Sequence, residues 1–301
     1  EASMPRFRFL PNIPPVDYRI VLVALAAYFA LLLNTKLLGH FYTILSDLGS
    51  YDMGFAMSPP FVLIAASTLV FAPFSFRYVL KPFFVFLLLS GALAHYAMVK
   101  YGIVFDRGMI ENVVETNQAE AFSYLNLQSV LWFVLSGVLP AILLILTPIR
   151  YPETVLRGIG QRLVIMFIPI LILGGIGSLY FKDYASVGRN NKVLGKEIVP
   201  SSYITGTIQF VKRRYLYADM PFRKIGEDAH VVDAANRDKP TLMFLVVGET
   251  ARTQSVAANG YARDTSPFTN KISGLRAFQN VQSCGTATAV SVPCMFSPMD
   301  H

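Results

Sequence analysis

Residues 121–149 read AFSYLNLQSVLWFVLSGVLPAILLILTPI and contain no Lys, Arg, Asp or Glu. The charged residues that bound this stretch are Glu120 and Arg150. A helix of about 20 apolar residues crosses the roughly 30 Å hydrocarbon core of a bilayer, and this stretch is longer than that. We therefore predict a membrane-spanning helix between Glu120 and Arg150.

Four more stretches without these charged residues occur before residue 182. They lie between Arg19 and Lys36, Asp52 and Arg77, Lys81 and Lys100, and Arg162 and Lys182. The first and third are the shortest, and they span fully only with flanking residues or with Lys side chains that reach the interface. We predict that residues 1–181 form an α-helical membrane domain with five transmembrane helices.

The composition of the chain supports its assignment to a bilayer. Hydrophobic residues make up 53% of the chain, charged residues 15%, and the mean hydropathy is +0.47. An average soluble domain has about 25% charged residues. The net charge of +7 does not indicate a nucleic-acid partner, because the basic residues flank the predicted spans and form no continuous stripe with interleaved aromatic residues.

The distribution of Lys and Arg among the short loops predicts the orientation of the spans. Basic residues precede the first span and occupy the loops between spans two and three and between spans four and five. The loops at residues 37–53 and 101–120 hold a single Arg between them and several acidic residues. We expect the basic loops and the N-terminus in the cytoplasm, and everything after Lys182 on the outer side.

The chain after residue 181 divides into two segments. Residues 182–240 have scattered charges and no sustained apolar run, so we interpret them as a connector that lies along the bilayer surface. Within the connector, Lys212-Arg-Arg214 attracts anionic headgroups either as a plain interfacial anchor or as a specific lipid site, and we favour the anchor. The apolar run Thr241-Leu-Met-Phe-Leu-Val-Val247 predicts a strand buried on both faces. Residues 241–301 are therefore expected to begin an α/β domain.

Two features of this last segment are candidates for chemistry. Glu249 follows the predicted strand, where ligands of α/β sheets bind, and it is either a metal ligand or an acidic cap of the next helix. The stretch Ser283-Cys-Gly-Thr-Ala-Thr-Ala289 predicts a turn followed by a helix. The backbone amides of this turn either hold a phosphate at the start of the helix or serve only as its cap. Cys284 and Cys294 are too far apart for a zinc knuckle, and an oxidising compartment favours a disulfide over a free buried pair.

A third candidate site lies in the outward loop before span four. Asn112, Thr116 and Glu120 recur at i, i+4 and i+8, so we expect them to share one face of a helix. They form either the solvated stripe of an amphipathic surface helix or a polar patch that receives a lipid headgroup. The periodicity does not choose between these two interpretations.

These motifs together resemble the phosphoethanolamine transferases of Gram-negative bacteria, the family that includes the lipid A enzymes and the mobile colistin-resistance enzymes. The resemblance covers nearly the whole chain. It is carried by Tyr101-Gly-Ile-Val-Phe-Asp106, residues 112–120, Lys182-Asp-Tyr-Ala-Ser186, Arg189-Asn-Asn-Lys192, Val247-Gly-Glu-Thr-Ala-Arg252, Asn259-Gly-Tyr261 and Ser283-Cys-Gly-Thr-Ala-Thr-Ala289. It implies a multi-pass protein of the bacterial inner membrane with an alkaline-phosphatase-like domain in the periplasm.

The resemblance also implies an activity and assigns residues to it. Such an enzyme moves phosphoethanolamine from phosphatidylethanolamine to lipid A through a covalent threonine intermediate at a Zn²⁺ site. The implied roles are nucleophile and metal contact for Thr288, zinc ligand for Glu249, headgroup binding for Asn112, Thr116 and Glu120, and a disulfide for Cys284 and Cys294. A threonine hydroxyl is a poor nucleophile near neutral pH, so a cation that stabilises its alkoxide fits this chemistry.

Several alternatives remain open from the sequence. Thr286 is a rival nucleophile, and only the family pattern favours the second threonine of the motif. In the family, the remaining zinc ligands are an Asp-His pair and a further His far downstream, so we expect an incomplete site and no turnover in a chain ending at His301. We assign no role to Asp300-His301. The alternative functions are transfer of phosphoethanolamine or phosphoglycerol to another periplasmic glycan, and lipid binding by a membrane module without catalysis.

Overall fold

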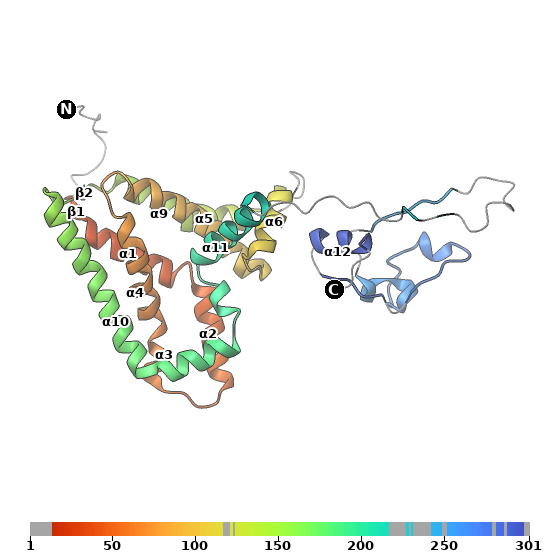
Figure 1. Cartoon of the computed structure of the whole chain (residues 1–301), viewed down its shortest axis with the longest axis horizontal. Helices are drawn as coiled ribbons and strands as arrows, with labels where there is room; N and C mark the ends of the chain where they lie inside the picture. Colours follow the sequence, from red (N-terminus) through yellow and green to blue (C-terminus); the bar gives the residue numbers. More distant parts are fainter. Residues whose placement is uncertain are drawn as a thin grey trace, which may run out of the picture. The chain divides into compact units, whose positions relative to one another are not determined.

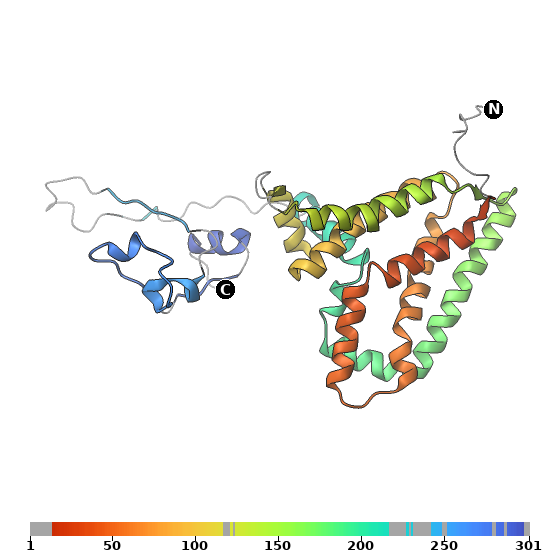
Figure 2. The same cartoon turned by 180° about the vertical axis from the view of Figure 1, so that it is seen from behind.

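Helices dominate the first of the two units into which the chain divides, Glu1–Tyr217 and Ala218–His301. The computed structural model describes residues 14–116, 121–122, 124–216, 227–228, 230, 242–248, 252–278, 281–285 and 288–297. Figures 1 and 2 show the helices of the first unit from opposite sides.

The first helices form a bent pair. Helix α1 (Tyr18–Leu31) and helix α2 (Thr35–Asp47) meet at an angle of 53°. Asp17 caps α1, because its carboxylate accepts a hydrogen bond from the Arg19 amide at 2.9 Å. The short strand β1 (Val16–Asp17), just before α1, pairs in parallel with β2 (Ile149–Arg150). The start of the first helix therefore lies beside the segment that precedes the last long helix.

A central helix packs against two others. Helix α3 (Met53–Met57) leads into α4 (Pro59–Phe71), which continues as the 3-10 turn η1 (Ala72–Phe74). Both α1 and α10 (Val155–Asn190) pack on α4. The ring of Phe71 meets Phe29 and Phe84 edge-on at centroid distances of 5.3 and 4.9 Å. Aromatic and aliphatic side chains of α1, α4 and α5 thus share one core.

Helix α5 (Leu80–Tyr101) packs against the continuous helical run that follows residue 126. This run consists of α8 (Leu127–Phe133), the π-turn η2 (Val134–Val138) and α9 (Leu139–Leu146). Gly137 permits this approach, since a Cβ at that position would lie 3.0 Å from the Cβ of Ala92. The Tyr28 hydroxyl donates to the carbonyl of Ser136 at 2.6 Å, which ties η2 to α1.

The last part of the first unit extends beyond the predicted membrane domain. Helix α10 is kinked at Tyr180, where φ is −121° and ψ is 20°, and it continues to Asn190. The expected boundary between residues 181 and 182 therefore falls inside a helix. After α10 come η3 (Leu194–Lys196), α11 (Ser201–Val211) and η4 (Lys212–Leu216). Helix α11 packs against α6 (Arg107–Glu115), as Figure 1 shows.

All five predicted spans are helical, but not all have the length that a span needs. Among the described residues, the helices long and apolar enough to cross a membrane are α5, α10 and the continuous run Leu127–Leu146, and the bent pair of α1 and α2 makes a fourth. The apolar helix Pro59–Phe74 is shorter. The structure therefore supports three or four spans, and a fifth span remains a prediction.

The basic loops of the sequence lie at one end of the helical unit. Lys81 donates to the carbonyl of Ile145 at 2.7 Å, so the start of α5 is beside the end of α9. Arg162 of α10 donates to the carbonyl of Ser75 at 3.1 Å, and its guanidinium lies 4.1 Å from the ring centroid of Phe76. Together with the β1–β2 pair, these contacts place the predicted cytoplasmic segments together (Figure 1).

The second unit has little regular structure in its described part. It contains the 3-10 turns η6 (Thr253–Ser255), η7 (Ala257–Asn259) and η8 (Thr269–Lys271), and the helix α12 (Thr288–Met295).

The prediction of a buried strand at residues 241–247 is wrong for the residues that the structure describes there. Residues 242–248 form no strand, and their apolar side chains are exposed, with Val246 at 85%. A strand needs a neighbour to pair its N–H and C=O groups. Within the described ranges the only sheet is the β1–β2 pair of the other unit.

Candidate active-site segments

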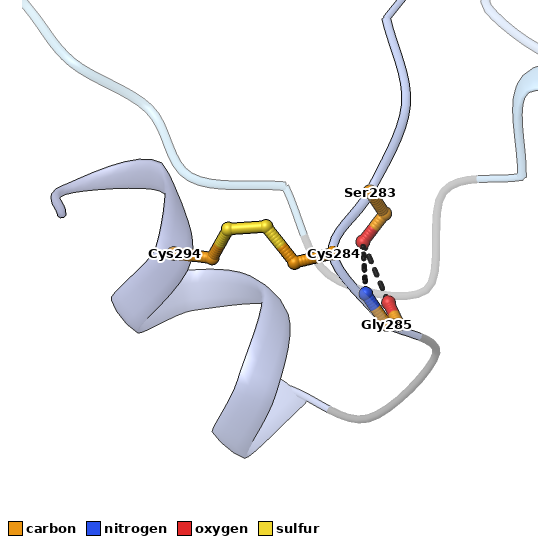
Figure 3. The surroundings of a disulfide bond; sticks show 4 residues. All are labelled: Ser283, Cys284, Gly285 and Cys294. Atoms are coloured by element: carbon orange, nitrogen blue, oxygen red, sulfur yellow. Dashed lines mark hydrogen bonds between the residues drawn. A yellow bond between two sulfur atoms is a disulfide. The ribbon is translucent and has the colours of Figure 1, made fainter. Parts of the chain in front are cut away.

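The predicted nucleophile stands at the start of a helix. Thr288 is exposed and is the first residue of α12. In the turn before it, the Ser283 hydroxyl donates to the carbonyl of Gly285 at 2.6 Å and accepts from the Gly285 amide at 3.3 Å (Figure 3). The expectation of a turn that leads into a helix at this motif agrees with this geometry. Thr286 and Glu249 lie outside the described residues.

A disulfide joins the turn to the helix. Cys284 precedes Gly285, and Cys294 lies in the last turn of α12, with their Cα atoms 6.4 Å apart (Figure 3). The disulfide expected from the two cysteines is therefore present. It restricts how far the turn can move from the helix that begins at Thr288.

The described residues do not assemble a metal site. No group of three or more His, Cys, Asp and Glu side chains comes together within the described ranges. A zinc ion is typically held by three or four such ligands. Thr288 alone of the predicted metal-contacting residues is described, so zinc binding by Glu249 and Thr288 stays a prediction.

The predicted headgroup residues lie at the end of α6, and the helix there is shorter than expected. Asn112 is in α6 and Thr116 is its C-cap, with an extended backbone at φ −61° and ψ 129°. The Thr116 hydroxyl donates to the carbonyl of Asn112 at 2.6 Å, and the Thr116 amide donates to the same carbonyl at 2.9 Å. The prediction of one continuous helical face through Glu120 is wrong at Thr116, because the helix ends there. Glu120 itself lies outside the described residues.

Contacts from the segment after α10 hold α6 at both ends. Near its C-terminus, Glu115 pairs with Arg214 at 3.7 Å, and the guanidinium of Arg214 lies 5.7 Å from the ring centroid of Phe210. At its N-terminus, Asp106 pairs with Lys196 at 3.4 Å. Arg214, which we interpreted as part of an interfacial anchor, thus also positions the helix that carries Asn112.

A buried polar junction that was not predicted from the sequence positions these segments. Asn34, 1% exposed, lies at the bend between α1 and α2. Its amide donates to the carbonyls of Phe29 and Val199 at 2.8 Å each, and its carbonyl oxygen accepts from the Val199 amide at 2.8 Å. Nearby, Nδ1 of His40 lies 3.0 Å from Oε2 of Glu197. A lone Asn inside a charge-free stretch is the signal that would have marked this junction.

Comparison with known proteins assigns the first unit to a family. Residues 63–215 match the family model described as phosphoethanolamine transferase EptA/EptB. The chain belongs to this family. The resemblance stated from the motifs is therefore confirmed. Residues 241–301 match the sulfatase family model.

Individual relatives of the EptA/EptB family agree with that assignment. Phosphoethanolamine transferase EptA of Escherichia coli (strain K12) is 38% identical over 81% of this chain and 44% of its own length. Phosphatidylethanolamine transferase Mcr-1 of Escherichia coli is 38% identical over 82% of this chain and 46% of its own. The chain thus spans about half the length of the curated relatives it matches.

A solved structure is also similar. The integral membrane protein lipooligosaccharide phosphoethanolamine transferase A (EptA) from Neisseria meningitidis is 32% identical and has a TM-score of 0.80. The match covers 95% of this chain and 53% of that one.

Proposed function

We propose that the protein transfers phosphoethanolamine from phosphatidylethanolamine to lipid A, with Thr288 as the residue that carries the group between them. Membership of the EptA/EptB family is the observation that carries this proposal. The position of Thr288 at the exposed start of α12, beside a turn held by the Cys284–Cys294 disulfide, supports its role. The positive end of a helix dipole favours the negative charge of a phosphate at that position.

The proposed transfer has two displacements at phosphorus. In the first, the Thr288 oxygen forms a bond to the donor phosphorus, the bond to the diacylglycerol oxygen breaks, and the hydroxyl proton passes to that leaving oxygen. In the second, a phosphate oxygen of lipid A attacks the same phosphorus, the bond to the Thr288 oxygen breaks, and the proton of the lipid A phosphate passes to that oxygen. A covalent intermediate divides one difficult step into two and lets diacylglycerol depart before the acceptor binds.

Zinc is proposed on the resemblance alone, with Glu249 and Thr288 among its contacts. When bound, such a cation supplies positive charge that favours a threonine alkoxide. The described residues provide no complete ligand set, so the described geometry supports only the placement of Thr288.

The donor headgroup is proposed to bind at the end of α6. Asn112 and Thr116 are both half-buried, and one hydrogen-bonded turn of chain connects them. Because the Thr116 hydroxyl already donates to the Asn112 carbonyl, its oxygen is left as an acceptor, while the Asn112 side-chain amide supplies donors. The proposed partner of the ethanolamine ammonium is Glu120, since a carboxylate forms a charge-assisted hydrogen bond with a cation.

The proposed membrane arrangement keeps five spans in residues 1–181, a connector at residues 182–240 and an alkaline-phosphatase-like domain from residue 241. The clustering of the basic loops at one end of the helical unit supports the alternation of the spans. With those loops in the cytoplasm, the domain after α10 lies in the periplasm. A reporter active only in the periplasm should work when fused after Tyr215, and activity of the fusion after Tyr151 instead would reverse this orientation.

The transfer itself is tested in cells. The complete reading frame of the gene is expressed in a Gram-negative host whose lipid A lacks phosphoethanolamine, and the lipid A is analysed by mass spectrometry. We expect the mass gain of one phosphoethanolamine with the unaltered protein and none with Thr288→Ala at equal protein level. Unmodified lipid A with the unaltered protein, or modification of another glycan in its place, would contradict the proposed acceptor.

A further inference from the structure

A hollow of about 420 Å³ lies between the start of α6, the turn η3 and helix α11. This volume falls within the range of roughly 300 to 1,000 Å³ that small-molecule sites occupy. Its wall is mainly polar and includes Asp106, Arg107, Lys196, Ser202, Thr205 and Gln209. None of these residues belongs to the proposed transfer chemistry or to the proposed headgroup site.

The charges around the hollow favour an anion. Arg107 and Lys196 are cationic and Asp106 is anionic. Both carboxylate oxygens of Asp106 are already engaged, since Oδ1 accepts from the Met109 amide at 3.2 Å and Oδ2 pairs with Lys196 at 3.4 Å. These contacts offset the charge of Asp106, which leaves the Arg107 guanidinium as the excess positive charge.

The backbone of α6 adds donors at the same place. Arg107 and Gly108 are the first two residues of the helix, and both line the hollow. Amides at these positions have no carbonyl one turn earlier within the helix, and Asp106 caps only the third, that of Met109. The start of a helix also carries the positive end of its dipole.

A buried hydroxyl without a partner is the independent sign of a ligand. Ser202 of α11 is 4% exposed, it forms part of the wall, and its Oγ has no hydrogen-bond partner in the described structure. A buried hydroxyl left unpaired is costly. Its neighbour Thr205 donates to the carbonyls of Ser201 and Ser202, so the Ser202 hydroxyl stands out as the unmatched group.

Close packing fixes the walls of the hollow relative to each other. A Cβ at Gly206 of α11 would lie 2.9 Å from the carbonyl oxygen of Phe105 and 3.2 Å from that of Asp106. Only glycine permits this approach of α11 to the start of α6. The donors from the two helices are thereby held around one space.

We propose that this hollow binds a phosphate group, through the Arg107 guanidinium, the first amides of α6 and the Ser202 hydroxyl. The Gln209 amide on the same wall supplies a further donor. The site lies at the opposite end of α6 from Asn112 and Thr116, so it is separate from the proposed donor site. The source of the phosphate is the headgroup of an anionic lipid or free inorganic phosphate, and the proposal does not depend on transferase activity.

Calorimetric titration of the whole protein in an uncharged detergent and phosphate-free buffer tests this site. The probes are inorganic phosphate, dihexanoyl phosphatidylglycerol and, as a cation, ethanolamine. Because Arg107 supplies a charged contact, Arg107→Gln should weaken phosphate or lipid binding roughly tenfold or more. Arg157→Gln is the matched control, since Arg157 is exposed in the first turn of α10 outside the wall and the change removes the same charge.

Each outcome of the titration either identifies the source of the bound phosphate or overturns the proposed site. Tighter binding of the short-chain lipid assigns a headgroup, and binding of inorganic phosphate alone assigns free phosphate. If Arg107→Gln does not fold, Ser202→Ala decides, and we expect several-fold weaker binding with unchanged helical circular dichroism. Absence of binding by either anion, equal losses in Arg107→Gln and Arg157→Gln, or binding of ethanolamine alone would overturn the proposal.

Discussion

Replacing Asn34 by Ala should destabilise the junction between the bent first helices and the segment before α11. The change removes three hydrogen bonds of 2.8 Å and leaves the amide and carbonyl of Val199 unpaired. Water does not replace these partners, because Val199 is only 1% exposed. Hydrogen bonds in membrane proteins contribute about 0.6 kcal/mol each on average, which gives a lower value of about 2 kcal/mol for three. Unpaired buried backbone groups cost about 1–3 kcal/mol each, so for the two groups of Val199 we expect a loss of about 2–6 kcal/mol.

The loss is measured as the change in free energy of unfolding, by reversible denaturation of the protein in mixed micelles. Thr43→Ala is the matched control, because Thr43 is exposed on α2 and its hydroxyl bonds only to the carbonyl of Gly39, one turn earlier. That change should stay within about 0.5 kcal/mol. If Asn34→Ala costs no more than Thr43→Ala, the buried junction does not hold these segments together and the reasoning fails.

Three further predictions concern the disulfide, a buried tyrosine and a surface ion pair. Cys284→Ser should destabilise the second unit by on the order of 2 to 3 kcal/mol, since the bridge closes a short loop, and faster limited proteolysis around α12 would report it. Burial raises the pKa of Tyr203 to about 12, outweighing its hydrogen bond to Ser90, so the folded state favours the neutral phenol. The stability that this group contributes is present below its ordinary pKa of 10.0 and is lost as the pH rises towards about 12. In an alkaline titration, the free energy of unfolding of Tyr203→Phe should therefore fall less steeply across that window than that of the unaltered protein. An unchanged profile would refute the assignment. Glu115→Gln should change the unfolding free energy by less than about 1 kcal/mol, because its pair with Arg214 is half-exposed, and a larger change in a denaturant titration would show a stronger contact.

The helical part of the fold could be read from the sequence because absence of charge over a span length is a local property. Each charge-free stretch proved to contain a helix, including the broken run from α8 to α9. The bend at Asn34 could not be placed in the same way. Its partner Val199 is 165 positions away along the chain, and only the fold brings the two together.

The wrong predictions concern hydrogen bonds that the pattern of residue types does not contain. The apolar run at residues 241–247 has the composition of a strand, but a strand forms only where a second strand pairs with it. The spacing of Asn112 and Thr116 fits a helix, yet the Thr116 hydroxyl bonds to the Asn112 carbonyl where the helix ends. The hollow beside Arg107 depends on Ser202 and Gly206 of a helix that the sequence analysis interpreted as a connector.

The position of the covalent intermediate is the most direct test of the proposed function. Enzyme expressed from its complete reading frame is incubated with phosphatidylethanolamine without acceptor, digested, and analysed by peptide mass spectrometry. We predict phosphoethanolamine on Thr288 in the unaltered protein and in Thr286→Ala, and no adduct in Thr288→Ala. An adduct on Thr286, or normal adduct formation in Thr288→Ala, would contradict the assignment of Thr288 as the nucleophile.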